Sequence, residues 1–253
     1  MLDNRHALIT GGGTGIGAAI ARALAKEGAA VSLAGRRKAP LDDIAATLPK
    51  ATTIVADITR DSDCAAMAAS ARAANGPIDI VIANAGAAAS APVAKVDLAH
   101  WHNMIDVNLT GAFLTVKATL ADVTRKSEGP RRIIFIASTA GLKGYPYVAA
   151  YCAAKHGVVG LARALSLELE PSGVTVNALC PGYTDTPLLD TAAEKISAKT
   201  GRTSEEARDM LAQDNPSGRL IKPEEVALAV IRLCSPSAAS VNGQAIEVTG
   251  GLQ

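Results

Sequence analysis

Short runs of β-branched and other apolar residues alternate with longer alanine-rich segments along almost the whole chain of 253 residues. Continuous apolar runs such as residues 133–136 are typical of strands that are buried on both faces of a parallel sheet. The predicted strands are Ala7–Thr10, Ala30–Ala34, Thr52–Ala56, Ile78–Ala83, Arg132–Ala137, Val174–Leu179 and Gln244–Val248, and the predicted helices include Ile16–Lys26, Asp61–Asn75 and Ala149–Leu169. This alternation predicts an α/β fold, a doubly wound parallel sheet of about seven strands with helices on both faces. No linker or repeat divides the chain, so we expect a single domain over residues 1–253.

The composition excludes several classes of protein. Apolar residues make up 49% of the chain and charged residues 19%, which supports a substantial core and excludes general disorder. The 25 basic and 24 acidic side chains leave a net charge of +1, so we expect no broad field that attracts nucleic acid. The N-terminal residues do not fit a signal peptide, and no apolar stretch is long enough to span a membrane. These features predict a soluble, cytoplasmic protein without nucleic-acid or membrane partners.

The cysteines and histidines form no pattern that predicts a disulfide or a metal site. The four cysteines are scattered without a C-x-x-C pair, and we expect them to be small buried residues in a reducing compartment. They are Cys64, Cys152, Cys180 and Cys234. None of the four histidines has metal-ligand spacing, so no metal is expected.

Residues 184–219 interrupt the alternation between the sixth and seventh predicted strands. This charged segment contains Thr203 followed by Glu206, a capping-box pattern that predicts the start of a helix. Pro223 followed by two glutamates predicts another helix start. An insertion at the carboxyl end of a strand is well placed to cover a ligand, so we expect a helical lid over residues 184–219. A solvated helical hairpin that serves packing alone is the alternative.

The first predicted strand runs into a glycine-rich loop, in which Gly11, Gly15 and Gly17 give the spacing G-x-x-x-G-x-G. Glycines at these positions let the backbone turn tightly and approach a pyrophosphate, which then lies at a helix N-terminus. The predicted dinucleotide contacts in this loop are Gly11, Gly13, Thr14, Gly15, Ile16 and Gly17. A flexible connection between a strand and a helix is the alternative.

The second predicted strand ends in Gly35, Arg36 and Arg37, at the point where NAD-binding folds place an acidic residue on the ribose 2′-hydroxyl. An arginine can pair with a 2′-phosphate, which an acidic residue would repel. The sequence therefore favours NADP(H), with NAD(H) as the other possible cofactor, and Arg36 and Arg37 as contacts. A solvated basic loop is the alternative.

Tyr151 and Lys155 are four residues apart on a predicted helix and so share one face of it. A free tyrosine has a pKa of about 10, and a nearby cation favours the phenolate, so Lys155 could tune Tyr151 for proton transfer near neutral pH. Ser138, directly after the predicted strand 132–137, strengthens this interpretation. Ser138 lacks the flanking glycines of a hydrolase nucleophile, which disfavours a serine hydrolase.

Together these motifs resemble those of the short-chain dehydrogenase/reductase family. The resemblance covers nearly the whole chain, through residues 248–251. The matching positions, in the family's order and spacing, are Thr10–Gly17, Asp57, Asn84, Ala85, Gly86, Asn108, Ser138, Tyr151, Lys155, Pro181 and Gly182. The resemblance implies a Rossmann-type fold and an NAD(P)-dependent oxidoreductase that interconverts a ketone and a secondary alcohol.

The resemblance also implies a role for each matching residue. Tyr151 would be the general acid in ketone reduction and the general base in alcohol oxidation. Lys155 would lower the pKa of Tyr151 and hold the nicotinamide ribose, Ser138 would bind the substrate carbonyl, and Asn108 would support Lys155 through a water-linked proton relay. The other implied cofactor contacts are Asp57 and Ile58 at the adenine, Asn84, Ala85 and Gly86 on the adenosine side, and Pro181, Gly182, Thr184 and Thr186 at the nicotinamide end.

Local structural roles are alternatives for several of these residues. Asn84 and Asn108 could satisfy backbone groups at strand and helix ends, and Asp57 could cap a helix. A catalytically silent, dinucleotide-sensing protein is the alternative to an enzyme. The intact set of Asn108, Ser138, Tyr151 and Lys155 argues against that alternative.

Within the family, residues 150–208 are most similar to 3-hydroxybutyrate dehydrogenases and 3-oxoacyl reductases. The former hold a free carboxylate with polar and basic side chains, whereas the matching positions here are apolar: Ala88, Ala140, Val148 and Ala192. The resemblance therefore favours reduction of a 3-oxoacyl thioester, with Lys143 or Arg219 either at the carrier's phosphates or solvated. A dehydrogenase of a hydrophobic cyclic or aromatic secondary alcohol is the other enzymatic alternative. A homotetramer is the implied assembly.

Overall fold

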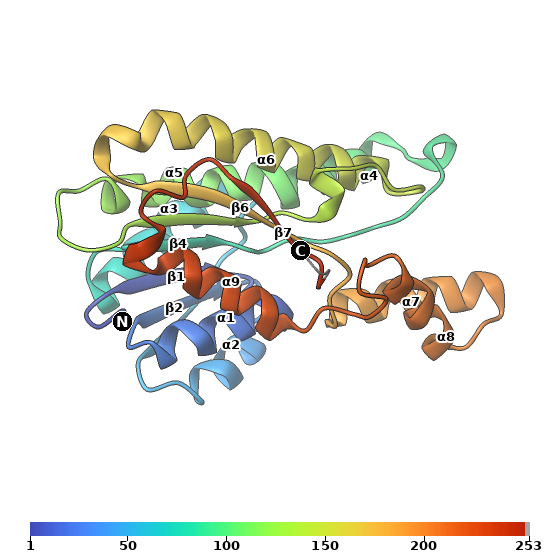
Figure 1. Cartoon of the computed structure of the whole chain (residues 1–253), viewed down its shortest axis with the longest axis horizontal. Coiled ribbons are helices and arrows are strands. Elements are labelled where there is room, and N and C mark those ends of the chain that lie inside the picture. The colour runs from blue at the N-terminus through green and yellow to red at the C-terminus, as the bar shows by residue number, and fades with distance from the viewer. Residues whose placement is uncertain (251–253) are drawn as a thin grey trace.

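One parallel sheet forms the centre of the computed structural model, which describes residues 1–250 of the chain. Within those residues the seven strands follow the order β3-β2-β1-β4-β5-β6-β7 (Figure 1). They are β1 His6–Thr10, β2 Ala30–Gly35, β3 Ala51–Val55, β4 Ile80–Ala83, β5 Arg132–Ile136, β6 Thr175–Pro181 and β7 Ala245–Val248. Each predicted strand is confirmed, with ends that differ from the prediction by at most two residues. Gly251, at the end of the resemblance, lies outside the described residues.

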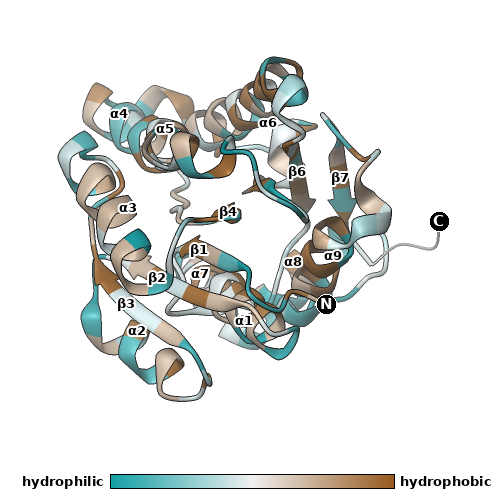
Figure 2. Cartoon of the chain, turned by 90° about the vertical axis from the view of Figure 1, so that its left-hand side faces the viewer, coloured by the Kyte–Doolittle hydropathy of each residue, from teal (hydrophilic) through white to brown (hydrophobic). Residues whose placement is uncertain are grey.

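Helices cover both faces of this sheet (Figure 2). On one face lie α1 Gly15–Lys26, α2 Lys38–Ala45 and α9 Pro223–Cys234, and on the other α3 Asp61–Asn75, α4 Leu98–Ile105, α5 Gly111–Val123 and α6 Ala149–Leu169. In β5, Ile133 and Phe135 belong to one core, while Ile134 and Ile136 belong to the other. Both faces of the strand are buried, which is why its sequence is continuously apolar. The predicted doubly wound α/β fold is confirmed.

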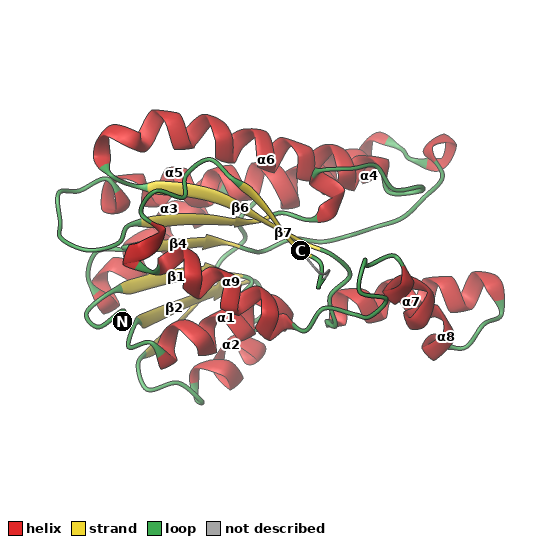
Figure 3. Ribbon diagram, in the orientation of Figure 1, coloured by secondary structure: helices red, strands yellow, loops and turns green. Residues whose placement is uncertain are grey.

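The segment between β6 and α9 forms two further helices, α7 Pro187–Thr200 and α8 Ser204–Gln213, which stand out beyond the carboxyl ends of the strands (Figures 1 and 3). The predicted capping box at the start of α8 is confirmed. Glu206 N donates to Thr203 Oγ1 at 3.2 Å, and Thr203 N donates to Glu206 Oε2 at 2.8 Å. Apolar residues of α7 and α8 pack on one another and form a small core separate from the two cores of the sheet.

The order of the strands reverses between β1 and β4, because β1 pairs with β2 on one side and with β4 on the other. In doubly wound sheets such a reversal opens a crevice at the carboxyl ends of the strands, where ligands bind. Thr10, which ends β1, and Asn84, which follows β4, meet at this point. Asn84 Nδ2 donates to Thr10 O at 2.8 Å, and Asn84 N donates to Thr10 Oγ1 at 3.1 Å. The fold therefore brings the glycine-rich loop and the segment 84–86 to one crevice.

The two cores of the sheet consist mainly of Ala, Val, Ile and Leu, and Phe135 is the largest fully buried side chain. The four cysteines are buried, as expected of small core residues. Among residues 1–250, no helix combines the length and the apolar character that crossing a lipid bilayer requires.

His6, the first residue of β1, is buried at the end of the sheet opposite the crevice. Its Nδ1 lies 2.8 Å from the carbonyl oxygen of Gly76, and its Nε2 lies 2.8 Å from Ser32 Oγ. The carbonyl can only accept, so Nδ1 carries the proton and Nε2 accepts from the Ser32 hydroxyl. Burial lowers the pKa of His6 from 6.5, although the hydrogen bond to Gly76 O and the charge of Asp79 act in the opposite direction.

We expect the free energy of unfolding to fall as the pH drops below 6.5, because the unfolded chain then binds a proton at His6 more readily than the folded chain. The contribution of the neutral ring is fully present above that pH and is lost as the pH falls toward the lowered pKa. Urea unfolding between about pH 5 and pH 7 measures this slope. A His6→Gln variant, which cannot titrate, should lose most of it, and an unchanged slope in that variant would contradict the assignment.

Candidate active site

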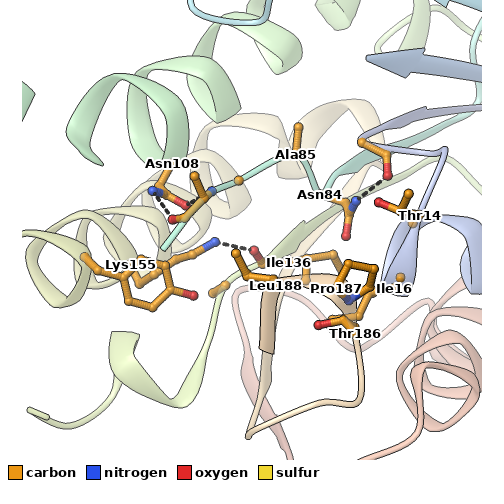
Figure 4. Close-up of a pocket in the computed structure, with 17 residues that line it drawn as sticks. Thr14, Ile16, Asn84, Ala85, Asn108, Ile136, Lys155, Thr186, Pro187 and Leu188 are labelled. Atoms are coloured by element: carbon orange, nitrogen blue, oxygen red, sulfur yellow. Dashed lines mark hydrogen bonds between the residues drawn. The ribbon is translucent and has the colours of Figure 1, made fainter. Parts of the chain in front are cut away.

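An open hollow of about 180 Å³ lies at the carboxyl ends of the central strands, beside the start of α7 (Figure 4). The loops after β1 and β4, the end of β5 and side chains of α6 form its walls. The lining residues are Gly11, Thr14, Gly15, Ile16, Gly17, Asn84, Ala85, Gly86, Ala87, Asn108, Ile136, Ala137, Tyr151, Lys155, Thr186, Pro187 and Leu188. The structure thus brings together, from distant parts of the chain, most of the residues that the sequence predicts for the site.

Close packing holds the glycine-rich loop against Asn84. Asn84 Nδ2 also lies 3.2 Å from Gly11 O, and it donates to this oxygen. A Cβ at Gly17 would lie 2.6 Å from Asn84 Nδ2 and would collide with Gly11 O, so a larger residue requires the loop to move. Gly11 itself has a φ of +67°, in the left-handed region that favours glycine. Asn84 therefore satisfies backbone groups at the end of β1, which is the structural alternative named for it above. By holding the glycine-rich loop in this way, it shapes one wall of the hollow.

The N-terminus of α1 opens toward the hollow through Thr14, Gly15 and Ile16. Thr14 occupies the N-cap position without a capping hydrogen bond from its side chain to any described residue, and the first turn contains no acidic side chain. The free backbone N–H groups and the positive end of the helix dipole are therefore available to an anion. Together with the close backbone approach at Gly11 and Gly17, this end of α1 fits the pyrophosphate of a dinucleotide.

Tyr151 and Lys155 lie on one face of α6, as their spacing predicts. Lys155 is 5% exposed, and its Nζ donates to Ile136 O at 2.9 Å and lies 5.6 Å from the centre of the Tyr151 ring (Figure 4). Burial lowers the pKa of Lys155 to about 8. Burial also raises the pKa of Tyr151 to about 12, and hydrogen bonding by Ser138 offsets this only in part. The net pKa of Tyr151 is thus raised rather than lowered, because lost hydration outweighs the other effects, and Tyr151 keeps its proton at neutral pH. The lowering that Lys155 itself would cause stays a prediction.

Ser138 lies two residues after the end of β5, and its side chain is close enough to Tyr151 to act on that residue's pKa. Its Oγ also accepts from Ala140 N at 3.1 Å, an interaction that starts a short turn after the strand. The bond from Ala140 N orients the Ser138 hydroxyl, although Ser138 is not part of the lining of the hollow itself.

Asn108 lies in a π-helical turn, Asp106–Thr110, between α4 and α5, a distortion that is frequent at functional sites. Its side chain is buried and bonds both backbone groups of Ala87, with Nδ2 donating to O at 2.9 Å and Oδ1 accepting from N at 3.2 Å. Asn108 Nδ2 also donates to Met104 O at 3.0 Å. Asn108 thus anchors the loop after β4, and the water-linked relay to Lys155 stays a prediction.

Several predicted cofactor contacts lie outside the hollow. They are Gly13, Arg36, Arg37, Asp57, Ile58, Pro181, Gly182 and Thr184. Arg36 and Arg37 are exposed in the turn between β2 and α2. The Asp57 carboxylate accepts from the backbone and hydroxyl of Thr59, at 3.0 and 2.8 Å, and these bonds, with a smaller effect of Arg36, lower the pKa of Asp57. The Ile58 side chain is part of the core, so only its backbone can face a ligand.

Five lining residues are absent from the prediction: Ala87, Ile136, Ala137, Pro187 and Leu188. Ile136 contributes its carbonyl group, which accepts a hydrogen bond from Lys155. The two alanines have small side chains and so leave the hollow open. Backbone groups and small side chains carry no signal in a single sequence. Pro187 and Leu188 directly follow Thr186, which the sequence does predict as a cofactor contact. Their position next to Thr186 is the signal that could have identified them as lining residues.

A family model described as short chain dehydrogenase matches residues 5–197. The chain belongs to the short chain dehydrogenase family. The crystal structure of a point variant of actinorhodin polyketide ketoreductase with NADPH is similar to it, with a TM-score of 0.93 and 37% identity over 100% of this chain and 99% of that chain. D-beta-hydroxybutyrate dehydrogenase of Rhizobium meliloti is 36% identical over 98% of both chains. Cis-4-hydroxycyclohexanecarboxylate dehydrogenase of Sinomonas cyclohexanicum is 37% identical over 98% of this chain and 96% of its own.

These findings confirm the resemblance that the motifs indicate. As a short chain dehydrogenase, the protein is an NAD(P)-dependent oxidoreductase that interconverts a ketone and a secondary alcohol. The hollow, with the uncapped N-terminus of α1 at one side and the Tyr151–Lys155 pair at the other, is its candidate active site.

Proposed function

We propose that this short chain dehydrogenase reduces a ketone with NADPH, and that the ketone is a 3-oxoacyl thioester of coenzyme A or acyl carrier protein. The observation that carries the proposal is the Tyr151–Lys155 pair on the wall of a hollow that also contains the uncapped N-terminus of α1. With its pKa raised to about 12, Tyr151 is protonated at neutral pH, which is the state that ketone reduction requires of a general acid.

In this mechanism the residues of the chain orient the substrate and move the proton. NADPH, when bound with its pyrophosphate at the N-terminus of α1, supplies the hydride. Ser138 Oγ donates a hydrogen bond to the ketone oxygen and so holds the carbonyl beside the Tyr151 phenol. Tyr151 gives its proton to this oxygen as negative charge develops there. The ammonium group of Lys155, 5.6 Å from the ring centre, stabilises the phenolate that remains.

The preference for NADPH is supported by the turn after β2. Gly35 stands where an acidic residue would bind the 2′-hydroxyl of NAD, and the exposed Arg36 and Arg37 follow it. Arg36 is also close enough to Asp57, which lies after β3, for its positive charge to help lower the pKa of Asp57. The Arg36 guanidinium is therefore near the ends of both β2 and β3. The similarity to a polyketide ketoreductase solved with NADPH agrees with this preference.

The scarcity of charged side chains in the lining of the hollow supports an uncharged ketone over a small free acid. Among the lining residues that the structure describes, Lys155 is the one charged side chain, and Ile136 O already binds it. Arg219 forms a bidentate ion pair with Glu225, with both N–O distances at 2.7 Å, which weakens its expected role at the carrier's phosphates. Lys143, exposed and with Nζ 5.2 Å from the centre of the Tyr145 ring, remains the candidate for that contact.

A second candidate function is the dehydrogenation of a hydrophobic cyclic or aromatic secondary alcohol. A lining with a single charged side chain among the described residues also suits a hydrophobic ring, and the relative from Sinomonas cyclohexanicum is named for a cyclic alcohol. The substrates of the two candidate functions differ in what is attached to the reacting group. A 3-oxoacyl thioester continues into a charged carrier, whereas a simple cyclic alcohol does not.

Consumption of NADPH with acetoacetyl-CoA, beside uncharged linear, cyclic and aromatic ketones, tests the proposal, with NADH in parallel. We expect the thioester and NADPH to give the highest kcat/KM. An Arg36→Ser variant should raise the KM for NADPH about tenfold and leave the KM for NADH unchanged, whereas Arg22→Ser, an exposed arginine of α1, should change neither. A preference for NADH would overturn the role of Arg36, and turnover of cyclic ketones alone would favour the second candidate.

We further propose that the enzyme is a cytoplasmic homotetramer. The family resemblance supports this assembly, and partly exposed apolar side chains lie on three neighbouring helices of one face: Trp101 on α4, Phe113 on α5 and Leu167 on α6. Burial of such residues between subunits would remove apolar surface from water.

A further inference from the structure

The two connections that join the lid helices to the body run side by side. The outgoing segment, residues 183–185, and the returning segment, residues 219–221, form a short parallel pairing in which Thr184 faces Ile221. Ile221 N donates to Tyr183 O at 2.9 Å, and Asp185 N donates to Ile221 O at 2.8 Å. We refer to these two paired segments as the neck of the lid. The neck means that α7 and α8 leave and rejoin the body at one place.

Asn215, two residues after the end of α8, fastens this neck with its side chain. Oδ1 accepts from Tyr183 N at 2.9 Å, while Nδ2 donates to Tyr183 O at 2.9 Å and to Arg219 O at 2.7 Å. The one side-chain amide therefore forms hydrogen bonds with the backbone N–H and C=O of Tyr183 in the outgoing segment and with the C=O of Arg219 in the returning segment. Asn215 is 4% exposed, so these bonds are shielded from water.

The fit around this amide is tight on the side of β6. A Cβ at Gly182 would collide with Asn215 Oδ1, so Gly182 leaves the room that the amide occupies. Gly182 is one of the predicted contacts at the nicotinamide end, but it does not line the hollow. In this structure, its lack of a side chain makes room for Asn215.

The neck leads directly into the wall of the hollow. Thr186, Pro187 and Leu188 line it, and they come immediately after the segment 183–185 (Figure 4). Thr186 is also the N-cap of α7, where its hydroxyl accepts from Leu189 N at 3.4 Å. The position of Tyr183 therefore fixes where these wall residues begin, and Asn215 fixes the position of Tyr183.

We propose that Asn215 is a positioning residue for hydride transfer, which locks the segment 182–186 against the nicotinamide end of the cofactor and makes the lid and that segment move as one body. The proposal rests on the proposed function, because it assumes that the nicotinamide lies beside Thr186 and Tyr151. It follows that loss of the amide affects the reacting end of the cofactor and leaves the adenosine end, at Arg36 and Asp57, unaffected.

The Asn215→Asp variant keeps the shape of the side chain but removes the donor to Tyr183 O and Arg219 O, and it turns a carboxylate oxygen toward those two carbonyl oxygens. We expect kcat to fall about tenfold and the Kd for NADPH to rise about fivefold. Binding of adenosine 2′,5′-bisphosphate, which carries the adenosine end alone, should be unchanged. Isothermal titration with both ligands and steady-state rates with the best ketone measure these quantities.

Asn177→Asp is the matched control. Asn177 in β6 is also buried, and its side chain accepts from Gln244 N at 3.0 Å and donates to Val241 O at 2.8 Å, away from the hollow. We expect it to lower the melting temperature, as Asn215→Asp does, without changing kcat or either Kd. Where Asn215→Asp does not fold, Asn215→Ser, which keeps one donor, serves in its place.

The outcomes separate the two proposals. Unchanged kcat and unchanged NADPH binding in a folded Asn215 variant, with only a lower melting temperature, would overturn the positioning role. Equal weakening of NADPH and adenosine 2′,5′-bisphosphate would overturn it too, because the effect would not be confined to the nicotinamide end. If the wild-type chain binds neither ligand, the proposed use of NADPH fails instead.

Discussion

Replacing Tyr151 by phenylalanine should slow ketone reduction by about 1,000-fold, because the variant has no proton to give to the ketone oxygen. The ring itself remains, so the packing of α6 against the hollow and the bond from Lys155 to Ile136 O should persist. NADPH binding, measured by fluorescence titration, should therefore stay within about twofold of the wild type. Steady-state rates at saturating NADPH measure the loss.

Tyr147→Phe is the matched control for this substitution. Tyr147 lies two residues before the start of α6, is 65% exposed, and its hydroxyl forms no hydrogen bond with any described residue. The control removes the same atom four residues away and should leave kcat unchanged. A Tyr151→Phe enzyme that retains near wild-type turnover would remove the basis for the proposed mechanism.

A Gly17→Ala substitution should weaken NADPH binding by at least about tenfold and lower the free energy of unfolding by about 2 kcal/mol. The added Cβ would collide with Gly11 O and would lie 2.6 Å from Asn84 Nδ2. The loop must then move away from the position in which Asn84 holds it, and the first backbone N–H groups of α1 move with it. Titration with NADPH and urea unfolding measure the two effects.

Gly160→Ala provides the comparison for this prediction. Gly160 lies within α6, and a Cβ there meets no atom within 4 Å. Alanine is favoured over glycine in a helix, so this control should keep NADPH affinity and leave stability unchanged or raised. Equal NADPH affinities for Gly17→Ala and the wild type would show that the loop does not approach the cofactor.

The features that the sequence predicts well are those that depend on local pattern. The continuous apolar run 133–136 identifies a central strand because a strand buried on both faces has no polar side. Thr203 and Glu206 identify the start of α8 because a capping box is satisfied within four residues. Tyr151 and Lys155 share a face of α6 for the same local reason, the periodicity of the helix.

The features that the sequence does not predict depend on burial and on distant backbone groups. Lys155 is expected to lower the pKa of Tyr151, but the surroundings that dehydrate the phenol come from several elements, and their combined effect raises it. Arg219 is equally suited by its sequence to a phosphate or to a carboxylate, and only the fold brings Glu225 to it. Asn215 has no recognisable motif, because its three partners are backbone atoms of Tyr183 and Arg219.

The most direct test of the account is to follow the hydride itself. The wild-type enzyme is given NADPH with both hydrogens at C4 of the nicotinamide replaced by deuterium, together with the best ketone of the panel, and the alcohol is analysed by mass spectrometry and NMR. The account predicts one deuterium on the carbinol carbon and none elsewhere, with no alcohol formed by Tyr151→Phe in the same time. Alcohol without deuterium at that carbon, or deuterated alcohol formed equally fast by Tyr151→Phe, would contradict it.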